Sequence, residues 1–265
     1  MADLPGIASF WIGPRLRWID KLSLASFVAL GHPVTLFHTG EAPAPGVPTG
    51  VDLVRAEEIW PEIGASIAGL PPAPLSDVFR LHLMQRSEMI WVDTDVIALR
   101  PLRPSGGYLI GRQEGDWVNG AVMRLPPTSP ALRMLLAAFD DPAAVFPWLE
   151  PAQQEEIRRI SPERRQAETA RLVGNAFGPI AQTYALQATG EIDHALPQES
   201  LNPIPWWLGD LYFDPRGTLD HWVTKNTLCL HLYSSRLRPF FKRRRPPKGS
   251  PLARMARRIG FDDFR

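Results

Sequence analysis

Two carboxylates, Asp93 and Asp95, stand two residues apart directly after the apolar run 90–92. That run predicts a buried strand, and the acids then lie at its carboxyl end, where α/β proteins bind their ligands. Paired carboxylate oxygens suit a hard divalent cation, which can neutralise the charge of a phosphate-containing ligand. The pair therefore predicts a cation site at one edge of a sheet.

The segment before the acidic pair predicts a helix that carries two further charges. Residues 69–75 are rich in proline and predict a loop, and Ser76 has the side chain of a helix N-cap, so we expect a helix from 76 to about 87. Asp77 and Arg80, at i and i+3, share one face of this helix. The two side chains either pair locally or face the strand end, where they could bind hydroxyl groups.

Strands and helices are expected to alternate along most of the chain. This order predicts an α/β layer fold with a largely parallel central sheet flanked by helices. The expected strands are 7–12, 33–38, 51–54, 89–92, 107–112 and 118–124, and the expected helices are 18–30 (closed by Gly31), 55–59, 76–87, 129–139 and, broken near Pro162, 150–173.

Composition narrows the functional classes. The chain has 265 residues, of which 45% are hydrophobic, enough for one large core. It has no uncharged apolar run long enough for a transmembrane helix and no signal-peptide pattern at its N-terminus. The one cysteine, Cys229, excludes an intrachain disulfide framework and predicts a small buried side chain. We therefore expect a cytoplasmic protein.

A basic segment near the C-terminus departs from the nearly neutral net charge of +1. Residues 236–258 contain ten basic and no acidic residues, with Phe240 and Phe241 among them. Such a segment could bind an anionic membrane surface or be a solvated extension. Nucleic acid is not expected as a partner, because no RNA-binding pattern accompanies the charge. We expect a main domain at 1–235 and a basic tail at 236–265, with peripheral association at the inner face of a membrane.

Residues 76–102 resemble the signature of glycosyltransferase family 32, the sugar-binding region that contains the DXD motif. This family includes bacterial capsular and lipopolysaccharide sugar transferases and is related to α-1,4-galactosyltransferases and initiating mannosyltransferases. The chain departs from the pattern where the family has Gly-Gly, because Ser87-Glu88 stands there. The matching residues are Ser76, Asp77, Arg80, Trp91, Asp93, Asp95, Val96 and Pro101.

Weaker matches extend the resemblance over about residues 7–235. Trp11, in the first strand, would stack on a nucleotide base or belong to the core. Asn119 would approach donor or acceptor, or only shape a bulge before Gly120. The segment 177–179 resembles the family's Gly-Pro at a helix start. His231 resembles the family's C-terminal histidine, which implies a metal or diphosphate contact, although such a histidine is often a core residue.

The resemblance implies a GT-A fold and a retaining transfer of a hexosyl or hexosaminyl group from a UDP- or GDP-linked nucleotide sugar. It implies Mn²⁺ or Mg²⁺ held by Asp95 with Asp93 and His231, so that Asp93 and Asp95 are the catalytic candidates. Asp93 also joins Trp11, Asp77, Arg80 and Asn119 as a donor-binding candidate, and Asp116 is the acceptor-binding candidate. The implied acceptor is a glycan or lipid-linked sugar of bacterial polysaccharide synthesis.

Two alternatives stay open from the sequence. A haloacid-dehalogenase-type phosphatase also places Asp-x-Asp after an apolar strand, but it needs a downstream lysine followed by further acids. Asp140 and Asp141 precede every later lysine, which disfavours that chemistry. A catalytically inactive relative that acts as a partner in polysaccharide assembly is the second alternative.

Overall fold

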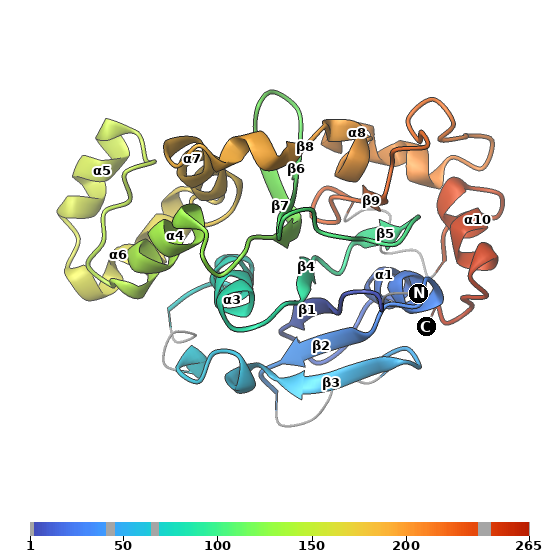
Figure 1. The fold of residues 1–265 in the computed structure, drawn as a ribbon, viewed down its shortest axis with the longest axis horizontal. Coiled ribbons are helices and arrows are strands. Elements are labelled where there is room, and N and C mark those ends of the chain that lie inside the picture. Colours follow the sequence, from blue (N-terminus) through green and yellow to red (C-terminus); the bar gives the residue numbers. More distant parts are fainter. Residues whose placement is uncertain (1–2, 41–45, 65–68, 238–244, 265) are drawn as a thin grey trace.

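A seven-stranded sheet forms the centre of the protein, with the strand order β3-β2-β1-β4-β7-β6-β8. The computed structural model describes residues 3–40, 46–64, 69–237 and 245–264. A second, two-stranded sheet consists of β5 (Val96–Ala98) and β9 (Cys229–His231) (Figure 1). The strands of the central sheet are β1 (Ile7–Trp11), β2 (Val34–His38), β3 (Val51–Arg55), β4 (Ile90–Val92), β6 (Leu109–Arg112), β7 (Val118–Arg124) and β8 (Ala195–Leu196).

The sheet is mixed but mostly parallel, as the sequence predicted. Strands β3, β2, β1 and β4 run parallel to one another, and β8 runs parallel to β6. Only β7 is antiparallel to its neighbours, β4 and β6. The reason for the β6–β7 exception is the connection of residues 113–117, which is too short for the crossover that a parallel pair requires.

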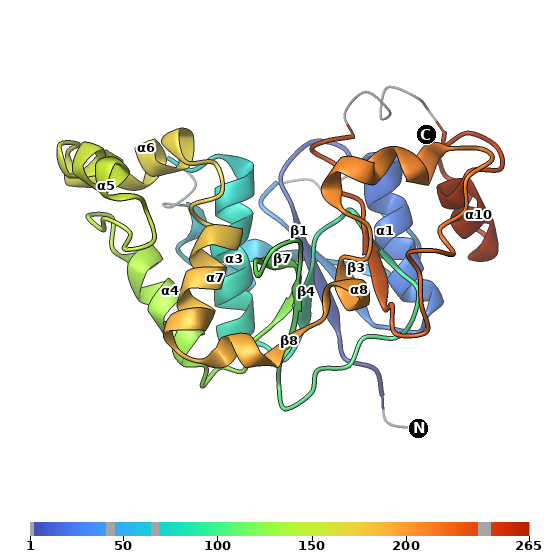
Figure 2. The same ribbon diagram turned by 90° about the horizontal axis from the view of Figure 1, so that it is seen from above.

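Helices cover both faces of the sheet (Figure 2). The helices α3, α4 and α7 pack on one face and α1 on the other. The α-helices are α1 (Trp18–Ala29), α3 (Pro72–Arg86), α4 (Pro130–Asp140), α5 (Pro151–Arg158), α6 (Arg165–Leu172), α7 (Pro179–Ala188), α8 (Gln198–Leu201) and α10 (Pro251–Arg258). The 3₁₀ helices are η1 (Ala56–Glu58), η2 (Pro162–Arg164), η3 (Glu191–His194) and η4 (Trp206–Phe213).

Strand β4 illustrates how the sequence builds the two layers. Its three residues are all buried, and their side chains alternate between the faces of the sheet. Ile90 and Val92 join the core cluster that contains Phe27 of α1, whereas Trp91 joins the cluster that contains Phe79 of α3. This double burial fixes the strand end from which Asp93 and Asp95 follow.

Helix α3 begins earlier than the sequence predicted. It starts at Pro72, so Ser76 lies in its second turn and is not the N-cap. The prediction of a loop was wrong because prolines fit the first turn of a helix, whose N–H groups need no intrahelical partner. At the other end, Ser87 replaces the expected Gly-Gly turn. It ends the helix in an extended conformation, and its hydroxyl donates to the Leu83 carbonyl at 2.8 Å.

The C-terminal helix α10 packs onto the protein. Leu252 and Ala256 of α10 are buried in a cluster with Ile19 of α1 and Tyr212 of η4. Residues 238–244 of the basic segment lie outside the described residues. Within the described ranges, no helix is both long enough and apolar enough to span a membrane.

Candidate functional site

The turn that joins β4 to β5 carries both acids. Asp93 follows β4 and Asp95 precedes β5, and the turn is closed by the Val96 N–H, which donates to the Asp93 carbonyl at 3.2 Å. The Asp93 N–H donates to the carbonyl of Ala121 on β7 at 2.7 Å. The acidic pair therefore stands at the carboxyl edge of the parallel strands, as the sequence predicted.

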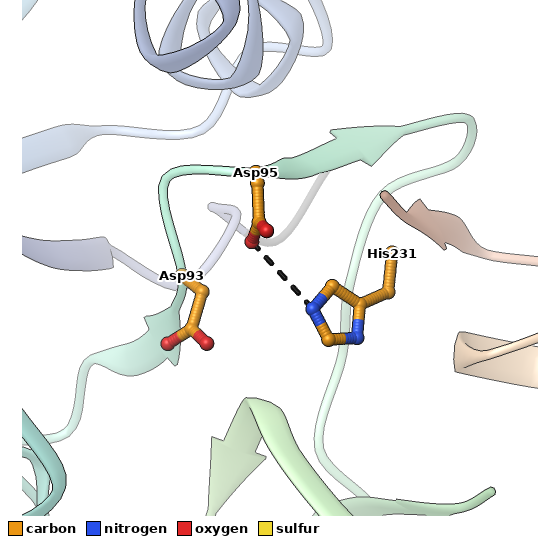
Figure 3. Close-up of side chains that lie close together, drawn as sticks. All are labelled: Asp93, Asp95 and His231. Carbon is orange, nitrogen blue, oxygen red and sulfur yellow. Dashed lines mark ion pairs between the residues drawn. The ribbon is translucent and has the colours of Figure 1, made fainter. Parts of the chain in front are cut away.

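Strand β9 brings His231 to the same place. It pairs antiparallel with β5, and His231 lies opposite Val96, the residue after Asp95. One ligand atom from each of Asp93, Asp95 and His231 lies within 4.8 Å of the others, as Figure 3 shows. His231 Nε2 is 3.6 Å from Asp95 Oδ1, longer than a hydrogen bond. The three side chains thus converge on one point.

Asp95 is held by the backbone that follows β9. Its Oδ2 accepts a hydrogen bond from the Ser234 N–H at 2.7 Å. Tyr233, the preceding residue, has a φ of 50°, a left-handed conformation that is uncommon outside glycine. The Tyr233 ring also contacts His231, with 3.8 Å between the ring centroids. The strained turn at Tyr233 therefore places a backbone donor on Asp95 and an aromatic ring on His231.

Asp93 is held from the opposite side. Its Oδ1 accepts hydrogen bonds from the indole N–H of Trp91 at 2.7 Å and from the guanidinium of Arg80 at 3.1 Å. In the described part of the chain, Asp93 Oδ2 has no hydrogen-bond donor. The side chain is thus oriented through one oxygen and presents the other to the cavity.

Arg80 is a nearly buried hub between α3 and the strand ends. Its guanidinium contacts Asp77 and Asp93, each at 3.1 Å, and donates to the Gly120 carbonyl at 2.9 Å. It also lies 4.9 Å from the centroid of the Trp91 ring. Burial raises the pKa of Asp77 to about 6; the Arg80 charge opposes this shift and the Asp93 charge adds to it. The sequence prediction that Asp77 and Arg80 share a helix face is confirmed.

Gly120 makes the approach of Arg80 possible. A Cβ at this position would lie within 3 Å of the Arg80 guanidinium and of the Gln182 amide. The site therefore requires a residue without a side chain at position 120.

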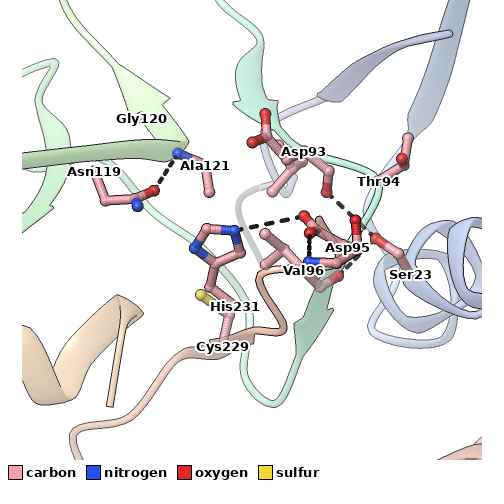
Figure 4. A network of polar contacts seen from close by, with 12 residues as sticks. Ser23, Asp93, Thr94, Asp95, Val96, Asn119, Gly120, Ala121, Cys229 and His231 are labelled. Atoms are coloured by element: carbon pink, nitrogen blue, oxygen red, sulfur yellow. Dashed lines mark hydrogen bonds and ion pairs between the residues drawn. The ribbon is translucent and has the colours of Figure 1, made fainter. Parts of the chain in front are cut away.

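Three buried polar residues of α1 hydrogen-bond to the turn and to β5, which follows it. Asp20 accepts a hydrogen bond from the Thr94 hydroxyl at 2.9 Å. The Ser23 hydroxyl donates to the Val96 carbonyl at 2.6 Å (Figure 4). The Ser26 hydroxyl accepts from the Ala98 N–H at 2.9 Å. These residues recur every third position on one helix face. The sequence prediction missed them, although their regular spacing on a mostly apolar helix was a usable signal.

A cavity of about 640 Å³ opens over the acidic pair. Trp11, at the end of β1, lines it beside Arg17, whose guanidinium lies 5.8 Å from the centroid of the indole ring. Other candidate residues from the sequence that line it are Asp77, Arg80, Asp93, Asp95 and His231. Among the described residues that line this cavity there is no lysine.

Two candidates from the sequence lie apart from this cavity. The Asn119 amide donates to Gln113 at 2.9 Å and its oxygen accepts from the Ala121 N–H at 2.8 Å, beside an irregular register between β6 and β7. These contacts match the alternative in which Asn119 shapes a bulge. Asp116 has a side chain that is 92% exposed and lines a different cavity, of about 260 Å³, with Trp117 and Tyr184.

The converging side chains fit a divalent cation. His231 Nε2 and Asp95 Oδ1, 3.6 Å apart, are too distant to form a hydrogen bond with each other. Their separation matches that of two ligand atoms that each lie about 2.1 Å from one ion. The third candidate ligand, Asp93, is already oriented by the hydrogen bonds that it accepts from Trp91 and Arg80. Two carboxylates and one imidazole form a ligand set that accepts Mn²⁺ as well as Mg²⁺.

Comparison with known proteins adds little to this geometry. No protein-family model and no curated protein matches the sequence. Among solved structures, the chain is similar to one described as "PaToxG Glycosyltransferase", with a TM-score of 0.47 and 16% sequence identity. The alignment covers 69% of this chain and 67% of that chain. A similarity of this extent concerns the course of the backbone and carries no information about a substrate.

Proposed function

We propose that the protein is a metal-dependent glycosyltransferase of the GT-A type, akin to glycosyltransferase family 32. It would transfer a sugar, with retention of configuration, from a nucleotide-diphosphate donor. The observation that carries this proposal is the convergence of Asp93, Asp95 and His231 at the carboxyl edge of a mostly parallel sheet. The cavity above them is large enough for a nucleotide sugar.

Asp95 and His231 are the principal ligands in this proposal, with Asp93 as the third. A bound cation supplies positive charge beside the departing nucleoside diphosphate, where negative charge accumulates. The hydrogen bond from the Ser234 N–H keeps Asp95 oriented toward this point. Because Asp93 presents only Oδ2, we assign it a shared role between the cation and a hydroxyl of the donor.

In this proposal Arg80 and Asp77 do not contact the sugar donor directly, in contrast to the expectation from the sequence. The Arg80 guanidinium is already engaged by two carboxylates and a carbonyl, so we infer that it positions Asp93. Asp77, at the cavity wall, balances the charge of Arg80. Trp11 provides an aromatic surface at the other side of the cavity, suited to stacking on the nucleotide base.

The acceptor in this proposal is a glycan or a lipid-linked sugar. Asp116 and the exposed Trp117 form a polar and aromatic surface, the combination that binds the two faces of a sugar ring. This surface lies outside the cavity of the acidic pair, so it suits a distal sugar of an extended acceptor.

Turnover of nucleotide sugars by the purified chain tests the proposal. UDP- and GDP-linked sugars are supplied with Mn²⁺, Mg²⁺ or EDTA, and the released nucleoside diphosphate is measured. We expect turnover that requires the cation and falls by at least about a hundredfold in Asp95→Asn. The control is Asp52→Asn on the edge strand β3, which keeps the same change of charge at an exposed position.

Two results would overturn the proposal. The first is hydrolysis of p-nitrophenyl phosphate without turnover of any nucleotide sugar, which indicates a phosphatase. The second is the absence of cation-dependent binding of any nucleotide in a thermal-shift measurement, which indicates an inactive relative.

A further inference from the structure

A second cavity lies at the far end of the β5–β9 pair from Asp95 and His231. It measures about 650 Å³, and four arginine side chains line it: Arg100, Arg216, Arg254 and Arg258. Among its lining residues that the structure describes, Asp220 is the one acid. The arginines come from three separate segments, since Arg100 follows β5, Arg216 follows η4, and the other two belong to α10. Tertiary packing therefore gathers the positive charge.

Among the described lining residues, the positive charge of the four arginines exceeds the negative charge of the one acid, Asp220. In the described part of the chain, none of the four arginines forms an ion pair. Arg254 donates to the carbonyl of Gly217 at 2.8 Å and to that of Gly249, and Arg100 donates to the carbonyl of Thr227 at 3.2 Å. These bonds orient two guanidinium groups while leaving their charge in place. The cluster is complementary to an anion that can accept several charge-assisted hydrogen bonds.

An apolar groove continues from the arginine cavity. It measures about 380 Å³ and shares Leu99, Met255 and Arg258 with that cavity, so the two are adjacent. Its wall includes Leu22 of α1 and Ile97 of β5. Figures 1 and 2 both show α10 beside α1, at the end of the molecule opposite α5 and α6. A cationic cluster, suited to an anion, and an apolar groove thus meet beside helix α10.

We propose that this composite site binds a phospholipid with an anionic phosphate head group. The phosphate lies among the arginines, where guanidinium groups can form bidentate hydrogen bonds with it. One acyl chain lies along the apolar groove, where each buried methylene group adds to the affinity. An inorganic phosphate would use only the cluster and a neutral lipid only the groove, so the pairing of the two selects an anionic amphiphile.

The position of the site links it to the acidic pair. Arg100 lies five residues after Asp95, so the chain between them spans at most about 17 Å. A membrane lipid held at one end of β5 would keep the cavity of Asp93 close to the membrane surface. Lipid binding itself does not depend on the proposed transferase activity, and it is measured without turnover.

Vesicle flotation with the full-length chain tests the arginine cluster. The vesicles contain phosphatidylcholine alone or phosphatidylcholine with phosphatidylglycerol. The variant Arg216→Glu/Arg258→Glu changes two exposed side chains of the cavity. Its control, Arg133→Glu/Arg158→Glu, makes the same change of net charge at exposed positions of α4 and α5. We expect the cavity variant to bind anionic vesicles at least about tenfold more weakly and the control to bind as the wild type does.

A soluble probe tests the apolar groove. Calorimetric titration compares dihexanoyl phosphatidic acid, below its micelle concentration, with inorganic phosphate. We expect the lipid phosphate to bind at least about tenfold more tightly, because the acyl chain adds buried apolar area. Ala29→Gln, in the groove wall, should weaken the lipid phosphate and leave inorganic phosphate unchanged, since it alters no charge.

Three results would overturn the proposal. Equal loss of vesicle binding in the cavity variant and its control would indicate general surface charge. Unchanged binding in the cavity variant would remove the cluster from membrane attachment. Equal affinity for inorganic phosphate and the lipid phosphate would indicate a free phosphate site without a lipid chain.

Discussion

Asp77→Asn is the substitution that best probes the electrostatics of the candidate site. The Asp77 carboxyl group is held on α3 between Arg80 and the cavity wall. Burial raises its pKa from 3.8 to about 6, which exceeds the opposing effect of the Arg80 charge. Asparagine keeps the shape of the side chain and an oxygen that can accept from Arg80, but it cannot ionise.

The size of the effect follows from the pKa difference. A carboxyl group whose pKa is higher in the folded than in the unfolded chain stabilises the fold when it is protonated. Its contribution is complete below about pH 4 and is lost as the pH rises through about 6. Two pKa units correspond to about 3 kcal/mol. The free energy of unfolding of Asp77→Asn, relative to the wild type, should therefore rise by about 3 kcal/mol from about pH 4 to about pH 8.

Urea unfolding in EDTA, followed by tryptophan fluorescence at several pH values, measures this difference. Asp52→Asn is the control, because Asp52 is exposed on the edge strand β3. Its difference from the wild type should vary little with pH. Parallel stability curves for Asp77→Asn and the wild type over the whole range would refute the reasoning, because a buried carboxyl group with a raised pKa cannot ionise without cost.

Three further substitutions test other parts of the structure. Gly120→Ala should displace the Arg80 guanidinium and lower nucleotide-sugar turnover by at least about tenfold, whereas Gly174→Ala, which has open space around it, should leave turnover unchanged. Ser23→Ala removes a buried hydrogen bond to the Val96 carbonyl and should lower the free energy of urea unfolding by about 1–3 kcal/mol; no change would mean that α1 does not fix the turn. His82→Phe tests the buried imidazole of His82, which stacks on Trp60. Burial and, to a lesser extent, the charge of Arg86 lower the pKa of His82 to about 4. A histidine with a lowered pKa contributes stability that is present above about pH 6.5 and is lost as the pH falls through about 4. Over that range the free energy of unfolding of the variant should therefore fall by about 3 kcal/mol less than that of the wild type. Equal acid sensitivity of the two proteins would contradict a buried neutral histidine.

The local part of the site was readable in the sequence. The apolar run 90–92 predicted a strand, and Asp93 and Asp95 lie at its carboxyl end. The spacing of Asp77 and Arg80 predicted their shared helix face, and their ion pair of 3.1 Å confirms it. Such features depend on residues a few positions apart, for which the period of a helix or strand is sufficient information.

Other features depended on contacts between distant segments. Periodicity could not show that the Asn119 amide forms its hydrogen bonds with Gln113 and Ala121. Nor could it show that Asp116 lines another cavity. The helix start at Pro72 was also missed, because proline at the first turn of a helix looks in sequence like a loop.

The sequence by itself determined the layered α/β class, the mostly parallel sheet and the position of the acidic pair at a strand end. The family resemblance implied His231 as a partner of that pair, and the tertiary structure brings it there, since the pairing of β5 with β9 joins residues far apart in the chain. Only the tertiary structure decided that Arg80 is held by Asp77, Asp93 and the Gly120 carbonyl at once, and that four arginines converge beside α10. The physical reason is that periodicity fixes each element alone, whereas the packing of all elements into one core selects which of their ends meet.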